Sequence, residues 1–131
     1  MSSDDATATE LEALRERCRL YESWLRAIDK HAKFDVWFKD AQSRYLYVNE
    51  SFEHAMGMDR QRLLGAAPSD IFADPGREGR VMAIDQKVME QGELHRVIPC
   101  DGSGSLKMHE EYRFLVEDAE GNVQGLGCFA I

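Results

Sequence analysis

Apolar side chains recur at alternating steps of three and four residues in the segment TELEALRERCRLYESWLRAIDKHA, which contains no proline or glycine. This spacing predicts an amphipathic helix over residues 9–32, opened by a capping box of Thr9 and Glu12. Residues 1–8 are polar and are predicted to be disordered. The apolar positions form a coiled-coil seam of Leu11, Leu14, Cys18, Tyr21, Leu25, Ile28 and Ala32.

The charged residues beside this seam favour a parallel homodimer. In such a dimer each g position faces the e position five residues later on the partner helix. Glu10 then faces Arg15, and Arg17 faces Glu22, so both pairs combine opposite charges. The alternative is a single amphipathic helix that lies on its own domain, because three heptads are short.

From Phe34 the apolar period changes to two, which is the repeat of a half-buried β-strand. FDVWFKD and RYLYV, separated by the turn DAQSR, are predicted to form a hairpin. Asn49 ends the second strand and is predicted to cap a short helix that stops at Gly57. Three more helices are predicted in MDRQRLLG, PSDIF and DPGREGRVMAIDQKVMEQG.

The last third of the chain returns to the period of a strand. ELHRVIPC, SLKMHEEYRFLVED and NVQGLGCFAI are predicted strands, joined by the turns CDGSGS and DAEGN. Strands at both ends of a helical insert predict an α+β fold. We expect one five-stranded antiparallel sheet with small helices on one face, preceded by the N-terminal amphipathic helix.

Four segments resemble the PAS (Per-Arnt-Sim) sensory domain family, and they occur in the family's order. FKDAQSRYLYVNESFEHAMG is similar to its first two strands and first small helix, and LLGAAPSDIF to the next segment. AIDQKVMEQGE is similar to its long helix, and EDAEGNVQGLGCFAI to its final hairpin. The resemblance identifies residues 34–131 as a PAS domain, with a departure at Ser43, where the family often has glycine.

The resemblance implies a sensory and signal-transmitting module of a larger signalling protein, such as a histidine kinase, a diguanylate cyclase or a transcription regulator. Such a module is not an enzyme; it binds a small molecule in a cup between helices and sheet, mediates homodimerisation, or does both. The family usually continues with Asp-Ile-Thr, so a C-terminal output domain is expected beyond Ile131 in the full-length protein.

Two other functions compete with this one. The first is a purely structural dimerisation domain with a filled core and no ligand. The second is a small enzyme with an α+β cone fold, which needs a convergent acid and base in its pocket. Only Glu110 with His54 or Tyr112 offers such a pair in this sequence.

Strand alternation places Glu110 and Tyr112 on one face of the fourth strand together with Met108, Phe114 and Val116. If that face meets the helices, Glu110 marks a polar pocket wall, because a carboxylate in a core requires partners. The alternatives are that Glu110 lies in water and that Asn49 is a helix cap without ligand contact. The expected pocket residues are Asn49, Phe52, Met56, Ile84, Val88, Glu110 and Tyr112.

The opposite face of the sheet is then expected to carry Trp37, Tyr45, Tyr47, Leu115, Leu126, Cys128 and Ala130. So much apolar surface needs a cover, and the N-terminal helix or a second subunit would supply it. Gly125 and Gly127 are expected to leave room for a ligand or for the close approach of a helix. The predicted dimer interface comprises Leu11, Leu14, Cys18, Tyr21, Leu25, Ile28, Trp37, Tyr45 and Leu126.

No cofactor is assigned, and the resemblance argues against haem and covalent flavin. Flavin-adduct members carry a reactive cysteine in the segment that matches LLGAAPSDIF, and haem members mostly use a histidine on the long helix. This chain has neither. Non-covalent flavin near Trp37 has no positive motif, and the cysteines and histidines are too scattered for a metal site.

The formal net charge of −8 disfavours binding to nucleic acid or to an anionic membrane. The 131 residues contain no apolar run long enough to cross a bilayer, and MSSDDATATE lacks the features of a signal peptide. Three widely spaced cysteines fit a reducing compartment. We therefore expect a cytoplasmic module whose partners are a second copy, an output domain and a small-molecule ligand.

Overall fold

The structure is a computed structural model that describes residues 3–99 and 108–131. It consists of two compact units, an N-terminal helix and a folded unit over Ala32–Ile131. The predicted turn CDGSGS and the start of the following strand lie outside the described residues.

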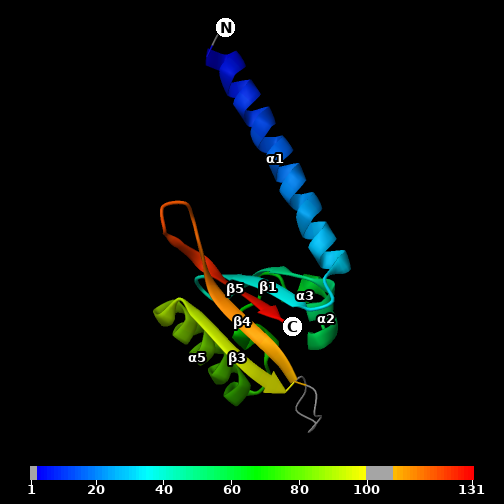
Figure 1. The fold of residues 1–131 in the computed structure, drawn as a ribbon, viewed down its shortest axis with the longest axis vertical. Coiled ribbons are helices and arrows are strands. Elements are labelled where there is room, and N and C mark those ends of the chain that lie inside the picture. The colour runs from blue at the N-terminus through cyan, green and yellow to red at the C-terminus, as the bar shows by residue number, and fades with distance from the viewer. Residues whose placement is uncertain (1–2, 100–107) are drawn as a thin grey trace. The chain divides into compact units, whose positions relative to one another are not determined.

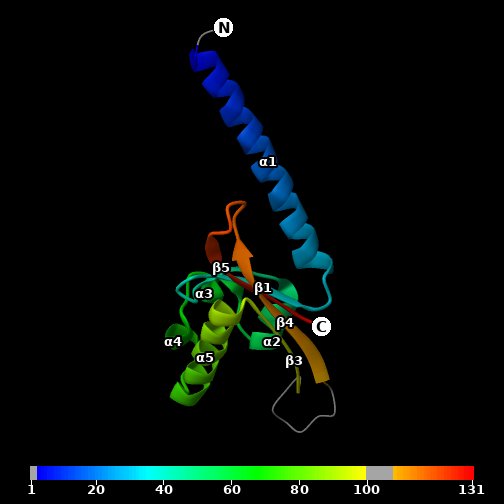
Figure 2. The ribbon, with the colours of Figure 1, turned by 60° about the vertical axis from the view of Figure 1, so that its left-hand side comes forward.

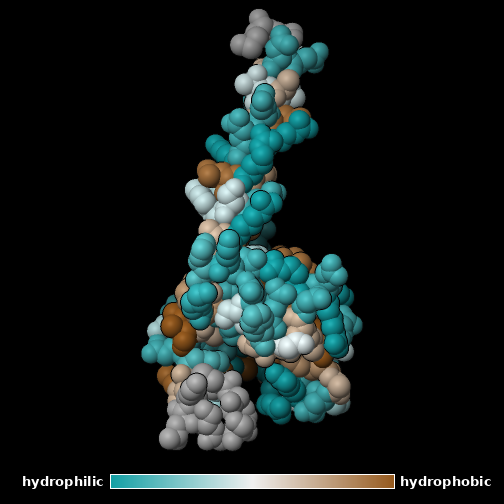
Figure 3. Space-filling model, turned by 90° about the vertical axis from the view of Figure 1, so that its right-hand side faces the viewer, coloured by the Kyte–Doolittle hydropathy of each residue, from teal (hydrophilic) through white to brown (hydrophobic). Residues whose placement is uncertain are grey.

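The N-terminal unit is the helix α1 (Ser3–His31), which begins six residues earlier than predicted. Residues 3–8, which were predicted to be disordered, are helical, and Asp4 and Asp5 in the first turn suit the helix dipole. Thr9 donates its hydroxyl to the Asp5 carbonyl within the helix, so it is not the predicted N-cap. No residue within Ser3–His31 is buried. In Figure 3, isolated apolar side chains interrupt the mostly hydrophilic surface of this helix.

The folded unit contains the predicted five-stranded antiparallel sheet. Its strands are β1 (Asp35–Asp40), β2 (Tyr45–Val48), β3 (Glu93–Pro99), β4 (Met108–Glu117) and β5 (Val123–Ala130). They lie in the order β2-β1-β5-β4-β3, so the last strand of the chain inserts between the first hairpin and β4 (Figure 1). The predicted α+β fold is confirmed.

The helices α2 (Glu50–Met56), α3 (Arg60–Leu63), α4 (Pro68–Ile71) and α5 (Pro75–Gln91) lie on one face of this sheet (Figure 2). The predicted caps form: Asn49 accepts from the amide of Phe52, and Asp59 accepts from the first turn of α3. Gly57 ends α2 at φ 65°, in the left-handed region that glycine tolerates. The helix α5 packs against β3, β4 and β5.

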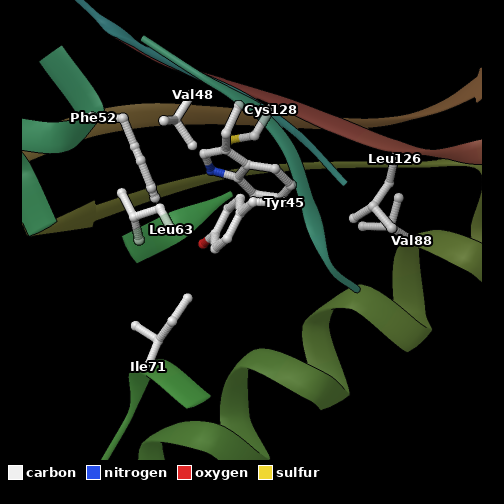
Figure 4. Close-up of a cluster of buried hydrophobic side chains, with 9 residues drawn as sticks. Tyr45, Val48, Phe52, Leu63, Ile71, Val88, Leu126 and Cys128 are labelled. Carbon is white, nitrogen blue, oxygen red and sulfur yellow. The ribbon is translucent and has the colours of Figure 1, made fainter. Parts of the chain in front are cut away.

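The core lies between these helices and the face of the sheet that we call the inner face. Trp37, Tyr45 and Leu126 are buried in it, although they were expected on the other face. Figure 4 shows side chains from α2, α3, α4 and α5 gathered with those of the strands. The cluster comprises Trp37, Tyr45, Val48, Phe52, Leu63, Ile71, Val88, Leu126 and Cys128.

The prediction of faces was wrong because alternation tells which residues share a face but not which face meets the helices. The inner face also carries Lys39, Glu111 and Arg113, and these charged residues indicated a face exposed to solvent. Trp37, Tyr45 and Leu126 are consequently removed from the expected dimer interface, since side chains buried under the helices are not exposed to a partner.

The outer face of the sheet has an apolar set of its own, which we call the outer aromatic row: Phe38, Tyr47, Phe114 and Phe129. The ring of Phe38 lies 6.0 Å from that of Tyr47 and 6.2 Å from that of Phe114. Phe114 in turn lies 5.0 Å from Phe129. These spacings are typical of aromatic pairs, so the row continues across β2, β1, β4 and β5.

The two glycines of β5 make these approaches possible and leave no room for a ligand. A Cβ atom on Gly127 would lie 2.7 Å from the rings of both Phe38 and Phe114. A Cβ atom on Gly125 would lie 2.0 Å from the carbonyl oxygen of Lys39 on the neighbouring strand. The expectation that these glycines open space for a ligand or for a helix is therefore wrong.

We predict that Gly125→Ala lowers the free energy of unfolding by about 3 kcal/mol or more, because backbone atoms of β1 must move. Gly79→Ala is the control, since a Cβ atom there meets nothing within 4 Å. In α5 it should raise stability by about 0.5–1 kcal/mol. Urea denaturation of both variants checks this, and a Gly125→Ala protein as stable as the wild type would contradict it.

Candidate functional site

An open cleft of about 710 Å³ lies between the inner face of the sheet and the helices α2 and α5. Trp37 of β1 lies at its floor, while Phe52 and Met56 come from α2 and Ile84 from α5. Cavities of this volume, with apolar walls and a few polar groups, are typical of small-molecule sites.

Of the seven expected pocket residues, Phe52, Met56 and Ile84 line this cleft. Val88 does not line it, because it is completely buried in the core below. Three of the proposed pocket residues therefore lie along one open cleft.

Asn49 acts as a structural cap at the junction of β2 and α2. Its Oδ1 accepts from the amides of Phe52 at 3.1 Å and Val36 at 3.0 Å. Its Nδ2 donates to the carbonyl of Phe34 at 2.8 Å. Completely buried, Asn49 fixes where α2 leaves the sheet, as its alternative interpretation held, and it does not line the cleft.

Glu110 and Tyr112 lie on the outer face of the sheet, so their assignment to the pocket was wrong. Glu110 is exposed, accepts a hydrogen bond from the Tyr112 hydroxyl, and contacts Nε2 of His95 at 3.2 Å. These two hydrogen bonds hold the pKa of Glu110 below its usual value. The acid/base pairing considered for an enzyme is thus on the surface and outside the cleft.

A set of charged side chains that the sequence did not predict lies at the floor of the cleft, and all of them except the half-buried Arg96 are buried. Lys39 Nζ of β1 contacts Asp85 Oδ2 of α5 at 2.8 Å, and Arg113 Nη1 of β4 contacts Asp85 Oδ1 at 3.1 Å. Arg113 Nε also contacts Glu111 Oε1 at 2.6 Å, and Arg96 Nε of β3 contacts the same oxygen at 2.7 Å. We call these five residues the buried ionic network.

Aromatic rings complete the surroundings of the buried cations. Lys39 Nζ lies 4.7 Å from the ring centroid of Trp37 and 4.8 Å from that of Tyr45. The guanidinium of Arg113 lies 5.0 Å from Trp37, which places the indole against two cations. Such contacts stabilise cations that have lost water.

The surroundings of the network disfavour the charged form of Lys39 and favour the charged form of Glu111. Burial lowers the pKa of Lys39, and the neighbouring Asp85 carboxylate only partly offsets this effect. Burial alone would raise the pKa of Glu111, but hydrogen bonds from Arg113 and Arg96 outweigh it and lower that pKa. With all five side chains ionised, three cations and two carboxylates give the network one excess positive charge, and the lowered pKa of Lys39 acts against that state.

Within the described parts of the chain, no group of three or more His, Cys, Asp or Glu side chains is placed to hold a metal ion. In those same parts, no helix is long and apolar enough to cross a membrane.

Comparisons with known proteins agree with this fold. A family model described as PAS fold matches residues 31–131. The PAS domain of Bordetella pertussis BvgS superposes with a TM-score of 0.68 at 15% identity, covering 85% of each chain. A PAS domain from Colwellia psychrerythraea superposes with a TM-score of 0.62 at 16% identity, covering 86% of this chain and 95% of the other.

VqmA of Vibrio cholerae, in a structure bound to DPO, superposes with a TM-score of 0.61 at 20% identity. The match covers 80% of this chain and 55% of that structure, so this chain spans about half of VqmA. No curated protein matches the chain in sequence. Identities this low establish a common fold and nothing more specific.

We predict that Asp85→Asn destabilises the protein more than Lys39→Met does. Asp85→Asn leaves Lys39 and Arg113 buried without their shared carboxylate, which should cost about 3–5 kcal/mol. Lys39→Met leaves Asp85 with Arg113 and removes the excess cation, so its loss should be about 2 kcal/mol or less. Urea denaturation at neutral pH measures both, and an equal or larger loss in Lys39→Met would refute this account of the network.

We also predict an acid-sensitive contribution from Glu111. Because its pKa in the folded protein is below the ordinary value of 4.5, its stabilising effect is complete above that value and is lost as the pH falls through the folded pKa. Between about pH 5 and about pH 3, the stability of the wild type should therefore decline more steeply than that of Glu111→Gln. Parallel declines of the two proteins would show that Glu111 contributes nothing.

Proposed function

Because this chain belongs to the PAS fold family, we propose that it is the sensory and signal-transmitting module of a larger signalling protein and that its signal is a small molecule bound in the cleft. PAS domains are typically non-catalytic sensory modules. The observation that carries the proposal is the open cleft of about 710 Å³ on the inner face of the sheet.

The chemistry of the cleft suits a ligand with an apolar body. Trp37, Phe52 and Phe72 supply aromatic surface, and Met56 and Ile84 supply flexible aliphatic surface. Arginine side chains lie among them and provide hydrogen-bond donors, so the cleft has both the apolar walls and the few polar groups that orient a ligand.

The similar structures support a place in signalling. VqmA has been solved bound to DPO, and it is a DNA-binding receptor of the LuxR type described as a dimer. A sensory box histidine kinase from Vibrio cholerae and the PAS domain of the histidine kinase ThkA share the fold. For this chain, the output domain and its activity are part of the proposal.

We further propose that α1 forms a parallel coiled coil with α1 of a second copy. Its apolar seam is exposed along the whole helix, and an isolated helix of this kind is marginally stable in water. Pairing of Leu14, Tyr21 and Leu25 across two copies would bury that seam. The matched charges of Glu10, Arg15, Arg17 and Glu22 favour the parallel arrangement.

Signal transmission then requires a route from the cleft to the strands. We propose that the buried ionic network is this route, because Asp85 of α5 binds Lys39 of β1 and Arg113 of β4. The strand β1 follows α1 in the chain. A ligand that displaces α5 relative to the sheet would change these contacts. That change would favour one of two packing states of the paired α1 helices.

Naphthylacetate and its neutral amide, naphthylacetamide, test ligand binding. With Trp24→Phe, the remaining tryptophan is Trp37, whose fluorescence reports an aromatic compound in the cleft. At least one of the two should bind, and Ala55→Phe, which adds a ring at a residue of the cleft lining, should weaken binding by about tenfold.

Val97→Phe is the matched control, because it adds the same ring at an exposed position of β3 outside the cleft. It should leave the affinity unchanged. If neither compound binds, or if both variants have the same effect, the ligand-binding function is wrong and a purely structural dimerisation domain is favoured.

Sedimentation equilibrium tests the coiled coil. Leu14→Asp combined with Leu25→Asp puts charges into the seam and should convert a dimer into a monomer. Ala13→Asp combined with Ser23→Asp adds the same charges outside the seam and should leave the dimer intact. A wild-type monomer, or a dimer that survives the seam substitutions, would contradict the proposal.

A further inference from the structure

The side chains that line the cleft carry a net charge of opposite sign to the net charge of the whole protein. The chain carries a formal net charge of −8. Its cleft, by contrast, is lined by the guanidinium groups of Arg77, Arg80, Arg96 and Arg113, and by the carboxylates of Asp35 and Glu111. An electropositive cleft in an acidic protein attracts and concentrates small anions.

The buried ionic network places part of this positive charge at the floor. Among the described residues of the network, Lys39, Arg96 and Arg113 share the carboxylates of Asp85 and Glu111. Burial of an uncompensated charge is costly, and a further anion would reduce that cost. Because Arg96 and Arg113 line the cleft, a ligand can supply this anion from the cleft side.

The two carboxylates of the lining already have partners of their own. Asp35 Oδ1 accepts from the Ser51 hydroxyl at 2.6 Å. Glu111 Oε1 accepts from both Arg113 and Arg96. In the part of the chain that the structure describes, Nε2 of His109 is a buried side-chain atom without a hydrogen-bond partner, and His109 lines the same cleft.

The apolar part of the lining lies close to these cations. Trp37 contacts the Arg113 guanidinium, and the Arg77 guanidinium lies 4.8 Å from the ring centroid of Phe72. A ligand in the cleft therefore meets aromatic surface and guanidinium donors together. Arg77 and Arg80 are exposed at the rim on α5, where they can steer an anion inward.

From these observations we propose that the ligand of the cleft is a small organic monoanion: an apolar body, preferably with a planar ring, that carries one carboxylate. The carboxylate pairs with Arg96 and Arg113 and hydrogen-bonds to His109, while the body packs on Trp37 and Phe52. A single carboxylate matches the single excess charge of the network, and guanidinium groups bind carboxylates with good geometry. This inference rests on the proposed ligand-binding function and specifies its chemistry.

Naphthylacetate and naphthylacetamide also test this inference, because they share the ring and differ in charge. In the Trp24→Phe protein, naphthylacetate should bind about tenfold more tightly than the amide. Arg96→Gln should reduce this preference to about twofold or less, since it removes a cation that lines the cleft while Glu111 keeps Arg113.

Two further variants guard against misfolding and against a general charge effect. Arg77→Gln combined with Arg80→Gln changes exposed rim residues, of which Arg80 pairs with Asp74 at 4.0 Å, and should weaken naphthylacetate by about fivefold while leaving naphthylacetamide unchanged. Arg62→Gln is the single-substitution control for Arg96→Gln, because it removes one arginine on α3 outside the cleft, and it should affect neither compound.

The outcomes separate the two proposals. If both compounds bind and Ala55→Phe weakens both, the cleft binds ligands. The anion inference is nevertheless overturned if the two compounds bind with equal affinity and the arginine substitutions do not alter that affinity. Should neither compound bind, the ligand-binding function itself fails. Naphthylacetate binding that survives Ala55→Phe would place the anion outside the cleft and also overturn the inference.

Discussion

Asp85 joins the helix α5 to the strands β1 and β4 of the inner face. It lies on α5 and is 2% exposed, with Lys39 of β1 on one oxygen and Arg113 of β4 on the other. Its ionic contacts connect the long helix to two strands that β5 separates in the sheet. Because each cation would otherwise be buried without a carboxylate, the position of α5 depends on this residue.

The cleft and its chemistry follow from the same contacts. With α5 held over the sheet by Asp85, Ile84 on the same helix lines the cleft together with residues of α2, and Arg113 lines it from β4. Arg96 and Arg113, two of the three cations of the network, line the cleft. On the other side of the sheet, glycines in β5 let the rings of the outer aromatic row approach one another.

The sequence predicted the elements well because each begins and ends with local chemistry. Asn49, Asp59 and Gly57 cap helices through hydrogen bonds and φ angles that depend on near neighbours, and the five strands follow from alternation. The site was predicted in part: Phe52, Met56 and Ile84 line the cleft. Glu110 was assigned to the pocket because the more apolar face of β4 was assumed to meet the helices. In the structure, Glu111 and Arg113 of the same strand form an ion pair and are buried together on the inner face. Their spacing of two residues in the middle of a strand was the available signal, but the partners Lys39 and Asp85 come from distant segments.

Methyl NMR of protein labelled at methionine tests most directly whether the inner-face cleft is the ligand site. Met56 lines the cleft, whereas Met82 is exposed on α5 and Met108 is exposed on β4. Addition of naphthylacetate should shift the Met56 methyl signal in a saturable manner and leave the Met82 and Met108 signals in place. Saturable shifts at Met108 with Met56 unmoved would place the ligand away from the cleft and contradict this account.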